Sequence, residues 1–221
     1  DYAFTGAGFP GTNGTCTAPL NRGANCDIEV QWVPTGLGVA NSTITINYDD
    51  GTGATNFTHG LTGNAVNPAN LSITAADPYD FGNVTQADTA TVLLTVQNTG
   101  DVPATAIAES GLAGDFAFTA PGTFPGGGGS CTTTIANGAT CTIEVQVTPS
   151  ATGVINGNVQ LDYNNGAVNT NYSHGLTVNG LAPAVLAITP GPANYDFGTR
   201  PTGSTNPVSY THLTLPTKRI V

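Results

Sequence analysis

The sequence has very little positive charge: 14 acidic residues face only four basic ones, and the net charge at pH 7 is −10. Such a chain repels the phosphates of nucleic acids and anionic lipid headgroups, which excludes both as partners. It also has no run of 18 apolar residues, so no part of it is expected to span a membrane. Charged residues are only 8% of the chain, where a typical soluble domain has about 25%. A surface that is polar through amides and hydroxyls favours an extracellular location.

Catalytic signatures are absent from the sequence as well. It contains no GxSxG, HExxH or paired-acid motif, and its glycine-rich run lacks the Lys-Ser/Thr pair of a phosphate-binding loop. Outside the C-terminal tail there are two histidines, His59 and His174, at equivalent places in an internal repeat. A repeat array rarely needs one active site per unit, so each histidine is expected to pack near a last strand or to hydrogen bond a turn. We predict no enzyme activity, no cofactor and no metal.

What the sequence does contain is a repeat at an offset of 115 residues. Between Cys26 and Gly51, 11 of 26 positions are identical to their counterparts at this offset without a gap. A unit of this length has the size of a domain, so each copy can bury its own core, unlike a solenoid unit of about 20–45 residues. Further matching pairs are Cys16 with Cys131, Pro34 with Pro149, Tyr48 with Tyr163 and His59 with His174.

The repeat divides the chain into modules. Residues 1–66 are expected to be the C-terminal half of one immunoglobulin-like module, 67–182 a complete module, and 183–207 the N-terminal start of a third. This division and the absence of methionine and of a signal peptide indicate a chain that is cut at both ends. Residues 208–221 are interpreted as a non-native tail, because positions 208–217 resemble a translated sequencing adapter rather than protein.

The four cysteines form two equivalent pairs, each separated by nine residues. Three pairings are possible in principle, but a self-sufficient module requires Cys16 with Cys26 and Cys131 with Cys141. Free thiols are an alternative. Zinc is a weaker one, because it takes four ligands and each module offers two cysteines and one distant histidine. A disulfide in each module implies an oxidising compartment, and closing a loop of about 11 residues stabilises by roughly 3 kcal/mol.

Alternation of apolar and polar residues with period two dominates residues 67–182, and no segment has the i, i+3, i+4 spacing of a helix. Val159, Leu161 and Tyr163 show the alternation in one predicted strand. We therefore predict an all-β fold of tandem immunoglobulin-like β-sandwich modules of about 115 residues. Strands are expected at 71–75, 79–84, 89–98, 103–109, 115–119, 140–148, 156–163 and 168–178.

Two turns and one loop are predicted from local sequence. Asn165-Gly166 is typical of a type I′ hairpin turn, and Asp50-Gly51 lies at the same place in the preceding module. Pro149 is expected to end the strand before it, because proline cannot donate to a ladder. The glycine-rich run 125–129 is interpreted as a flexible loop leading to the cysteines.

Few other side chains suggest a site. Glu29 and Glu144 lie on the polar faces of predicted strands and are interpreted as solvated charges. Trp32 is expected to fill a core or edge position, and a lone aromatic platform for a sugar is the alternative. Calcium at a module junction is the remaining metal hypothesis, since acidic extracellular modules offer oxygen ligands. The candidate carboxylates for it are those of Asp77, Asp80 and Asp196.

An ordered set of short motifs resembles a known repeat family, the bacterial immunoglobulin-like repeats of the choice-of-anchor D group, related to the abnormal-spindle/hydin type of domain. The resemblance implies a secreted or surface-displayed bacterial protein with tandem sandwiches and a cell-envelope anchor. Relatives in cilia and centrosomes act inside the cell, and the cysteine pairs argue against that branch. The motifs are Leu71-Ser72-Ile73, Asp80-Phe81-Gly82-Asn83-Val84, Thr95-Val96-Gln97-Asn98-Thr99-Gly100, Asp115-Phe116, Cys131, Gly138-Ala139-Thr140-Cys141, Val147-Thr148-Pro149 and Gly153.

These observations favour a non-enzymatic structural or adhesive segment of a secreted or cell-surface bacterial protein, acting as a stalk, spacer or contact surface. The alternative is an ancillary, carbohydrate-binding module of a secreted multidomain enzyme, which an exposed row of aromatics would support. A third hypothesis, an intracellular scaffold, would require four free thiols. A surface partner or a glycan is a conceivable ligand, and a monomeric array is expected.

Overall fold

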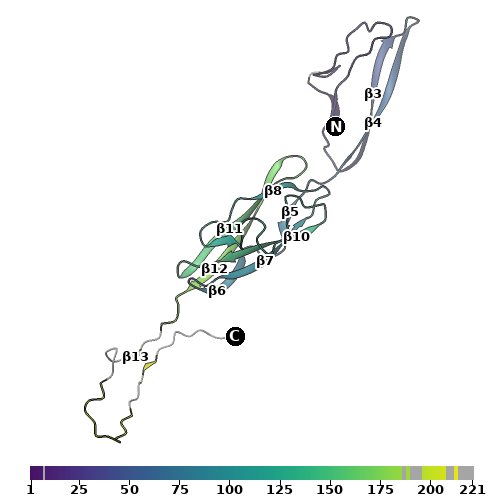
Figure 1. Cartoon of the computed structure of the whole chain (residues 1–221). Helices are drawn as coiled ribbons and strands as arrows, with labels where there is room; N and C mark the ends of the chain where they lie inside the picture. The colour runs from purple at the N-terminus through teal and green to yellow at the C-terminus, as the bar shows by residue number, and fades with distance from the viewer. Residues whose placement is uncertain (7, 186–187, 190–195, 208–211, 214–221) are drawn as a thin grey trace.

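The computed structural model describes residues 1–6, 8–185, 188–189, 196–207 and 212–213. Within these residues every regular element is a β-strand and no helix occurs. Figure 1 shows a long hairpin near the N-terminus, followed along the chain by a separate group of strands, β5 to β12. The all-β class expected from the alternating sequence is confirmed.

The strands of the central group form a sandwich of two four-stranded sheets. Neighbouring strands are antiparallel, except that β6 and β12 pair in parallel. The first sheet has the order β5 (Leu71–Ile73), β7 (Ala90–Asn98), β10 (Thr140–Val147) and β9 (Phe116–Phe118). The second sheet has the order β6 (Tyr79–Thr85), β12 (Asn169–Leu181), β11 (Gly153–Asn164) and β8 (Thr105–Glu109). This is the immunoglobulin-like sandwich that the number and spacing of the predicted strands indicated.

The core lies between the inner faces of the two sheets. Val96, Val145 and Val147 from the first sheet have no exposed surface, and Leu161 and Leu176 from the second are each 1% exposed. Successive side chains of a strand point to opposite faces, so the period-two pattern places each second residue in this core. Apolar burial of this kind is the main stabilising contribution to the sandwich.

The strand boundaries differ from the predicted ones by a few residues. The largest shifts, three residues each, are at the start of β11, which begins at Gly153 instead of 156, and at the end of β12, which ends at Leu181 instead of 178. Val154 and Ile155 of β11 pair there with Asn179 and Val178 of β12. The first residues of β11, Gly153 and the exposed Val154, do not follow the alternation of apolar and polar residues, so the sequence pattern did not indicate them. At β10 the strand ends at Val147, just before Pro149, as the missing amide of proline requires.

The N-terminal residues form two two-stranded sheets. One joins β1 (Tyr2–Phe4) to β2 (Val30–Trp32), and the other joins β3 (Gly38–Asp49) to β4 (Ala54–Ala65). The β3–β4 hairpin has the register of the β11–β12 hairpin: Ile44 pairs with His59, as Val159 pairs with His174. The sequence repeat is thus also a repeat of strand pairing.

The type I′ turn predicted at Asn165-Gly166 is wrong. Pairing of β11 with β12 ends at Asn164↔Asn169, so four residues form the loop, and only Gly166 among them has a positive φ, at 94°. The side-chain Oδ1 of Asn165 accepts hydrogen bonds from the amides of Ala167 and Val168 (2.9 and 2.8 Å), which closes a wider loop. The loop between β3 and β4 likewise has four residues, and there the Asp50 carboxylate accepts from Thr52.

The C-terminal part adds one short pair of strands, β13 (Ile188–Thr189) and β14 (His212–Leu213), which are antiparallel. The start of a third module remains a prediction. Most of the tail predicted to be non-native, residues 208–221, lies outside the described residues. No helix in the described part of the chain is long and apolar enough to cross a membrane.

Candidate functional site

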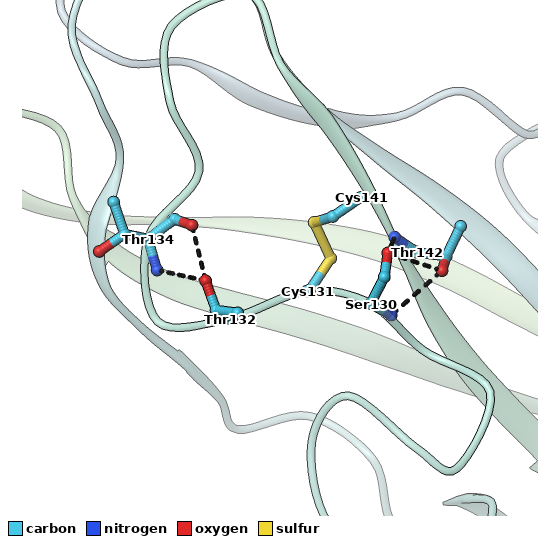
Figure 2. The surroundings of a disulfide bond; sticks show 6 residues. All are labelled: Ser130, Cys131, Thr132, Thr134, Cys141 and Thr142. Atoms are coloured by element: carbon cyan, nitrogen blue, oxygen red, sulfur yellow. Dashed lines mark hydrogen bonds between the residues drawn. A yellow bond between two sulfur atoms is a disulfide. The ribbon is translucent and has the colours of Figure 1, made fainter.

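The cystine of the sandwich fastens a long loop to the second residue of β10 (Figure 2). Cys131 is 4% exposed and belongs to the core, and it bonds to Cys141 with a Cα–Cα distance of 4.9 Å. Beside it, the Ser130 amide donates to the Thr142 carbonyl (2.8 Å), and the Thr142 amide donates to the Ser130 hydroxyl (3.0 Å). The loop is therefore held by a covalent bond and by a short ladder of hydrogen bonds.

Glu144 of β10 holds the other end of this loop. Its carboxylate accepts hydrogen bonds from the Thr119 hydroxyl and from the amide of Gly128 (2.7 Å). The Thr119 hydroxyl in turn accepts from the amide of Gly127 (2.8 Å), and the Glu144 amide donates to the Pro125 carbonyl (2.8 Å). Hydrogen bonds to a charged carboxylate are stronger than those to a neutral acceptor, so Glu144 holds the loop more firmly than a neutral side chain would.

The same arrangement occurs in the N-terminal residues. Cys16 bonds to Cys26, with a Cα–Cα distance of 4.8 Å. The Glu29 carboxylate accepts from the Thr5 hydroxyl, from the Asn13 amide (3.0 Å) and from the Asn13 side chain (2.9 Å). The Thr12 amide donates to the Thr5 hydroxyl (2.8 Å), as Gly127 does to Thr119 in the sandwich. We call each set of a cystine and a glutamate with its loop a clasped loop.

The hydrogen bonds that Glu29 accepts affect its acidity. The Thr5 hydroxyl first, and then the side chain and amide of Asn13, hold the pKa of the Glu29 carboxyl below its usual value. Donors that point at a carboxylate favour the charged form, because a protonated carboxyl is a poorer acceptor. The Glu29 carboxylate is thus favoured in its charged form while it binds its own loop.

The interpretation of Glu29 and Glu144 as solvated charges is incomplete: Glu29 remains accessible to solvent, as expected, but both carboxylates also bind a loop. The run 125–129 is a loop, as predicted, and its flexibility stays a prediction. Both glutamates accept several hydrogen bonds, and the glycine amides of the run are among the donors. Strand alternation places these glutamates on the polar face but does not say what lies above that face. The signal that could have found the arrangement is that both glutamates, both threonines and Pro10 with Pro125 repeat together.

The two histidines lie at equivalent places with opposite burial. His174 of β12 has no exposed surface; its Nδ1 lies 3.2 Å from the Tyr172 hydroxyl, and its Nε2 is buried without a partner among the described residues. His59 of β4 is exposed and stacks on Phe57 with ring centroids 6.4 Å apart. Among the described residues, the side-chain contacts of the two histidines are with aromatic rings, Tyr172 for His174 and Phe57 for His59.

Trp32 lies in β2, stacked on Tyr2 with ring centroids 5.6 Å apart. It is half-buried, and its Nε1 is buried without a partner among the described residues. A Cβ added to Gly63 would lie 2.5 Å from the indole, so the glycine makes room for the large side chain. The sandwich has Val147 and Val178 at the corresponding places. The Trp32 indole thus fills the space that the side chains of Val147 and Val178 fill in the sandwich, and one of its faces is covered by Tyr2.

The carboxylates proposed for calcium are used locally. Asp77 accepts from the Gly175 amide (2.7 Å), Asp80 from Gly82 (2.7 Å) and Asp196 from Gly198 (2.8 Å). In the described part of the chain no group of three or more His, Cys, Asp or Glu side chains could hold a metal ion. Asp80 and Asp196 close local backbone turns, whereas Asp77 joins the start of β6 to β12.

Two shallow hollows adjoin at one end of the sandwich. They measure about 440 and 430 Å³ and share Tyr163, Thr170 and Asn171. Amide and hydroxyl groups line most of the larger hollow, including those of Asn70 and Asn165, whereas the other is lined about equally by polar and apolar groups. Tyr163 itself is 6% exposed, and its hydroxyl accepts from the Leu71 amide (3.3 Å), so it offers no open ring for stacking.

Comparison with known proteins agrees with the sandwich. Residues 71–178 match the family model described as HYDIN/CFA65/VesB-like, Ig-like domain. Among solved structures the chain is similar to the VesB protease of Vibrio cholerae, with 14% identity and a TM-score of 0.40 over 51% of this chain and 32% of that one. It therefore spans about a third of VesB. It is also similar to the ASH/PapD-like domain 7 of human CEP192, with 11% identity and a TM-score of 0.39 over 52% of this chain and 88% of that one.

The secreted serine protease VesC of Vibrio cholerae is a third similar structure, with 16% identity and a TM-score of 0.32 over 65% of this chain and 33% of that one. No curated protein matches the chain. The family model covers every strand of the sandwich, from β5 into β12. The central sandwich has the Ig-like fold, and its residues 71–178 are similar to the HYDIN/CFA65/VesB-like family of Ig-like domains.

Proposed function

We propose that this chain is a non-catalytic segment of a secreted or cell-surface bacterial protein, and that its tandem Ig-like sandwiches act as a stiff spacer or contact surface. Two cystines support an oxidising compartment. The observation that carries the spacer role is the way the connector enters the sandwich. This connector, residues 67–70, follows the N-terminal hairpin directly.

The connector is bound to the sandwich along its length. The amide and side chain of Asn67 both donate to the Asp101 carboxylate (2.9 and 2.8 Å), and the Asp101 amide donates back to the Asn67 carbonyl (3.1 Å). The Ala69 amide donates to the Asn165 carbonyl (2.9 Å), and the Asn70 amide to Oδ1 of Asn98 (3.1 Å). A connector fixed by these hydrogen bonds loses the freedom that would let adjacent modules bend.

A distance measurement between modules tests this proposal. Spin labels on cysteines at Thr58 and Asn137, both exposed, report on the hairpin and on the sandwich. If the spacer is stiff, pulsed electron paramagnetic resonance should give one narrow distribution of distances between the two spin labels. Asp101→Ala removes the main hydrogen-bond acceptor of the connector and is expected to broaden the distance distribution. Asp88→Ala, at an exposed turn away from the connector, should leave the distribution unchanged. A broad distribution in the unmodified chain would contradict the spacer role.

A second candidate function is that of an ancillary, carbohydrate-binding module of a secreted enzyme. The observation that favours it is the polar hollow beside Asn165 and Asn171, since amides and hydroxyls are the groups that hydrogen bond sugar hydroxyls. Titration of the labelled chain with cellohexaose or laminarihexaose should shift the amides of these residues, and Asn171→Ala should abolish the shifts. Asn56→Ala, at the equivalent place in β4, is the matched control. Absence of shifts at millimolar sugar would contradict this function.

A further inference from the structure

The sequence contains five Asn-Gly pairs, the type of pair at which asparagine most readily loses its side-chain amide. The reaction needs no enzyme: the backbone nitrogen of the glycine attacks Cγ of the asparagine, and ammonia leaves. Glycine favours this attack because it has no Cβ to hinder the close approach of its backbone. The rate depends on whether the glycine nitrogen is held in a hydrogen bond and whether the chain around it can move. The pairs are Asn13-Gly14, Asn137-Gly138, Asn156-Gly157, Asn165-Gly166 and Asn179-Gly180.

In four of these pairs the structure restrains the groups that must react. The Gly14 amide donates to the Gly11 carbonyl (3.1 Å), and the Gly166 amide donates to Oδ1 of Asn164 (2.8 Å). Two further pairs lie within the paired strands β11 and β12. A bonded amide or a paired strand must first be released, so these four sites are expected to react slowly.

The pair Asn137-Gly138 is not restrained in this way. Both residues are exposed, and within the described part of the chain neither the Asn137 side chain nor the Gly138 amide has a hydrogen-bond partner. They form the middle of a turn in which the Ala139 amide donates to the Ala136 carbonyl (3.2 Å) and Gly138 has a φ of 69°. The nitrogen that must attack is therefore open to solvent.

This turn is held by the side chain of Asn98, which has no exposed surface. Its Nδ2 donates to the carbonyls of Ile135 and Ala136 (3.2 and 3.3 Å), and the Asn98 backbone amide donates to the Ala139 carbonyl (3.0 Å). The Oδ1 of Asn98 accepts from the Asn70 amide in the connector (3.1 Å). Asn98 thus links the turn to the connector.

We propose that Asn137 is a site of spontaneous deamidation, and that the isoaspartate formed there loosens the connector through Asn98. The Gly138 nitrogen loses its proton and bonds to Cγ of Asn137, while the side-chain nitrogen leaves as ammonia. Water then opens the cyclic imide. Cleavage between the nitrogen and Cγ gives aspartate, and cleavage between the nitrogen and the main-chain carbonyl carbon gives isoaspartate. The reaction is independent of the spacer role, whereas its consequence for bending rests on that role.

The two products should affect the turn differently. Aspartate leaves the main chain unchanged and adds a negative charge at an exposed position. Isoaspartate adds a methylene group to the main chain between the Ala136 and Ala139 carbonyls that Asn98 binds. The loop is closed by the Cys131–Cys141 disulfide, so its ends cannot move apart to absorb the added length. The hydrogen bonds to Asn98 should therefore weaken.

Peptide mapping by mass spectrometry tests the site. The full chain is incubated at mildly alkaline pH and digested in acid, and the peptide with Asn137 should change from amide to acid several-fold faster than the peptide with Asn165. The aged chain should also accept methyl groups from a protein isoaspartyl methyltransferase, and Asn137→Gln should remove most of this labelling. If Asn137 reacts no faster than Asn165, the proposal is wrong.

Hydrogen exchange at the Asn70 amide tests the link to the connector. In the isoaspartate fraction, separated by anion exchange, this amide should exchange several-fold faster than in the unmodified chain. Asn137→Asp adds the charge without the methylene group and should exchange like the unmodified chain. Asn98→Ala, which removes the acceptor, sets the upper limit. Unchanged exchange in the isoaspartate fraction would overturn the link, whereas a broad distance distribution in the spin-labelled chain would contradict the spacer role alone.

Discussion

The β3–β4 and β11–β12 hairpins have the same register but very different burial. His174 has no exposed surface whereas His59 is exposed, and Tyr163 is 6% exposed whereas Tyr48 is 49% exposed. The strand sequences are closely related, so their own pattern does not explain the difference. What differs among the described residues is the opposing sheet: β5, β7, β10 and β9 cover the second hairpin, whereas β1 and β2 are the strands that lie against the first. The burial of a side chain in these hairpins therefore depends on the opposing sheet as well as on the strand's own sequence.

The largest expected effect comes from shortening the same leucine in both hairpins. Leu176→Ala should destabilise the sandwich by about 2–5 kcal/mol, because it leaves a cavity in a closed core. Leu61→Ala should cost less than about 1 kcal/mol, since its half-buried side chain already contacts solvent. Urea unfolding followed by far-ultraviolet circular dichroism measures the sandwich, and the fluorescence of Trp32, the only tryptophan, reports on the N-terminal strands.

The fluorescence transition provides the internal control for this comparison. Leu176→Ala should shift the dichroism transition and leave that of Trp32 unchanged. Equal losses for the two leucine variants would mean that the hairpins are covered to the same extent in solution, and the contrast between the two regions would not hold.

The next effect separates the two cystines. Replacing Cys131 and Cys141 together by alanine should destabilise the sandwich by about 3 kcal/mol, as expected for a closed loop of about 11 residues. The same change at Cys16 and Cys26 should leave the unfolding of the sandwich unchanged, since these residues belong to the N-terminal strands. Melting curves recorded with and without reductant measure the contribution of each disulfide to the stability of the chain. Identical curves for the unmodified chain would show that the bonds contribute nothing to stability.

Much of the fold could be predicted because the sandwich obeys a local rule. Val145 and Leu161 are buried, as the alternating pattern of their strands requires. The hairpin loop was missed because a turn type depends on side-chain hydrogen bonds. Asn165 does not adopt the positive φ of a type I′ turn and instead bonds two amides further along the loop.

The clasped loops could not be predicted from strand patterns. Glu144 and Thr119 are 25 residues apart, and only the folded first sheet brings them together. Alternation says that Glu144 points away from the core, and it carries no information about a loop that returns over that face. The glutamate, threonine and proline of this clasped loop recur around Glu29, and this repetition was visible in the sequence. A repeat, however, does not show which groups these residues contact.

A smaller effect is expected from removing the glutamate of one clasped loop. Glu144→Ala leaves the Thr119 hydroxyl and the Gly128 amide without their acceptor, which should cost about 1–2 kcal/mol. Hydrogen exchange of the Gly128 amide should accelerate markedly, while amides of β11 and β12 change only with the global stability. Glu144→Gln keeps one acceptor oxygen and should restore part of the protection. Unchanged exchange at Gly128 in the alanine variant would show that the loop is held by the cystine alone.

The smallest effect is a pH dependence confined to the N-terminal clasped loop. Because hydrogen bonds hold the pKa of Glu29 below its usual value, its carboxylate stabilises the loop at any pH above the unfolded value of about 4.3. That contribution is lost as the pH falls through the lowered folded-state pKa. Protection of the Asn13 amide should therefore fall in acid, and Glu29→Gln should remove this dependence while retaining an acceptor for Thr5. An Asn13 amide with the same acid response in both proteins would assign the loss to another group.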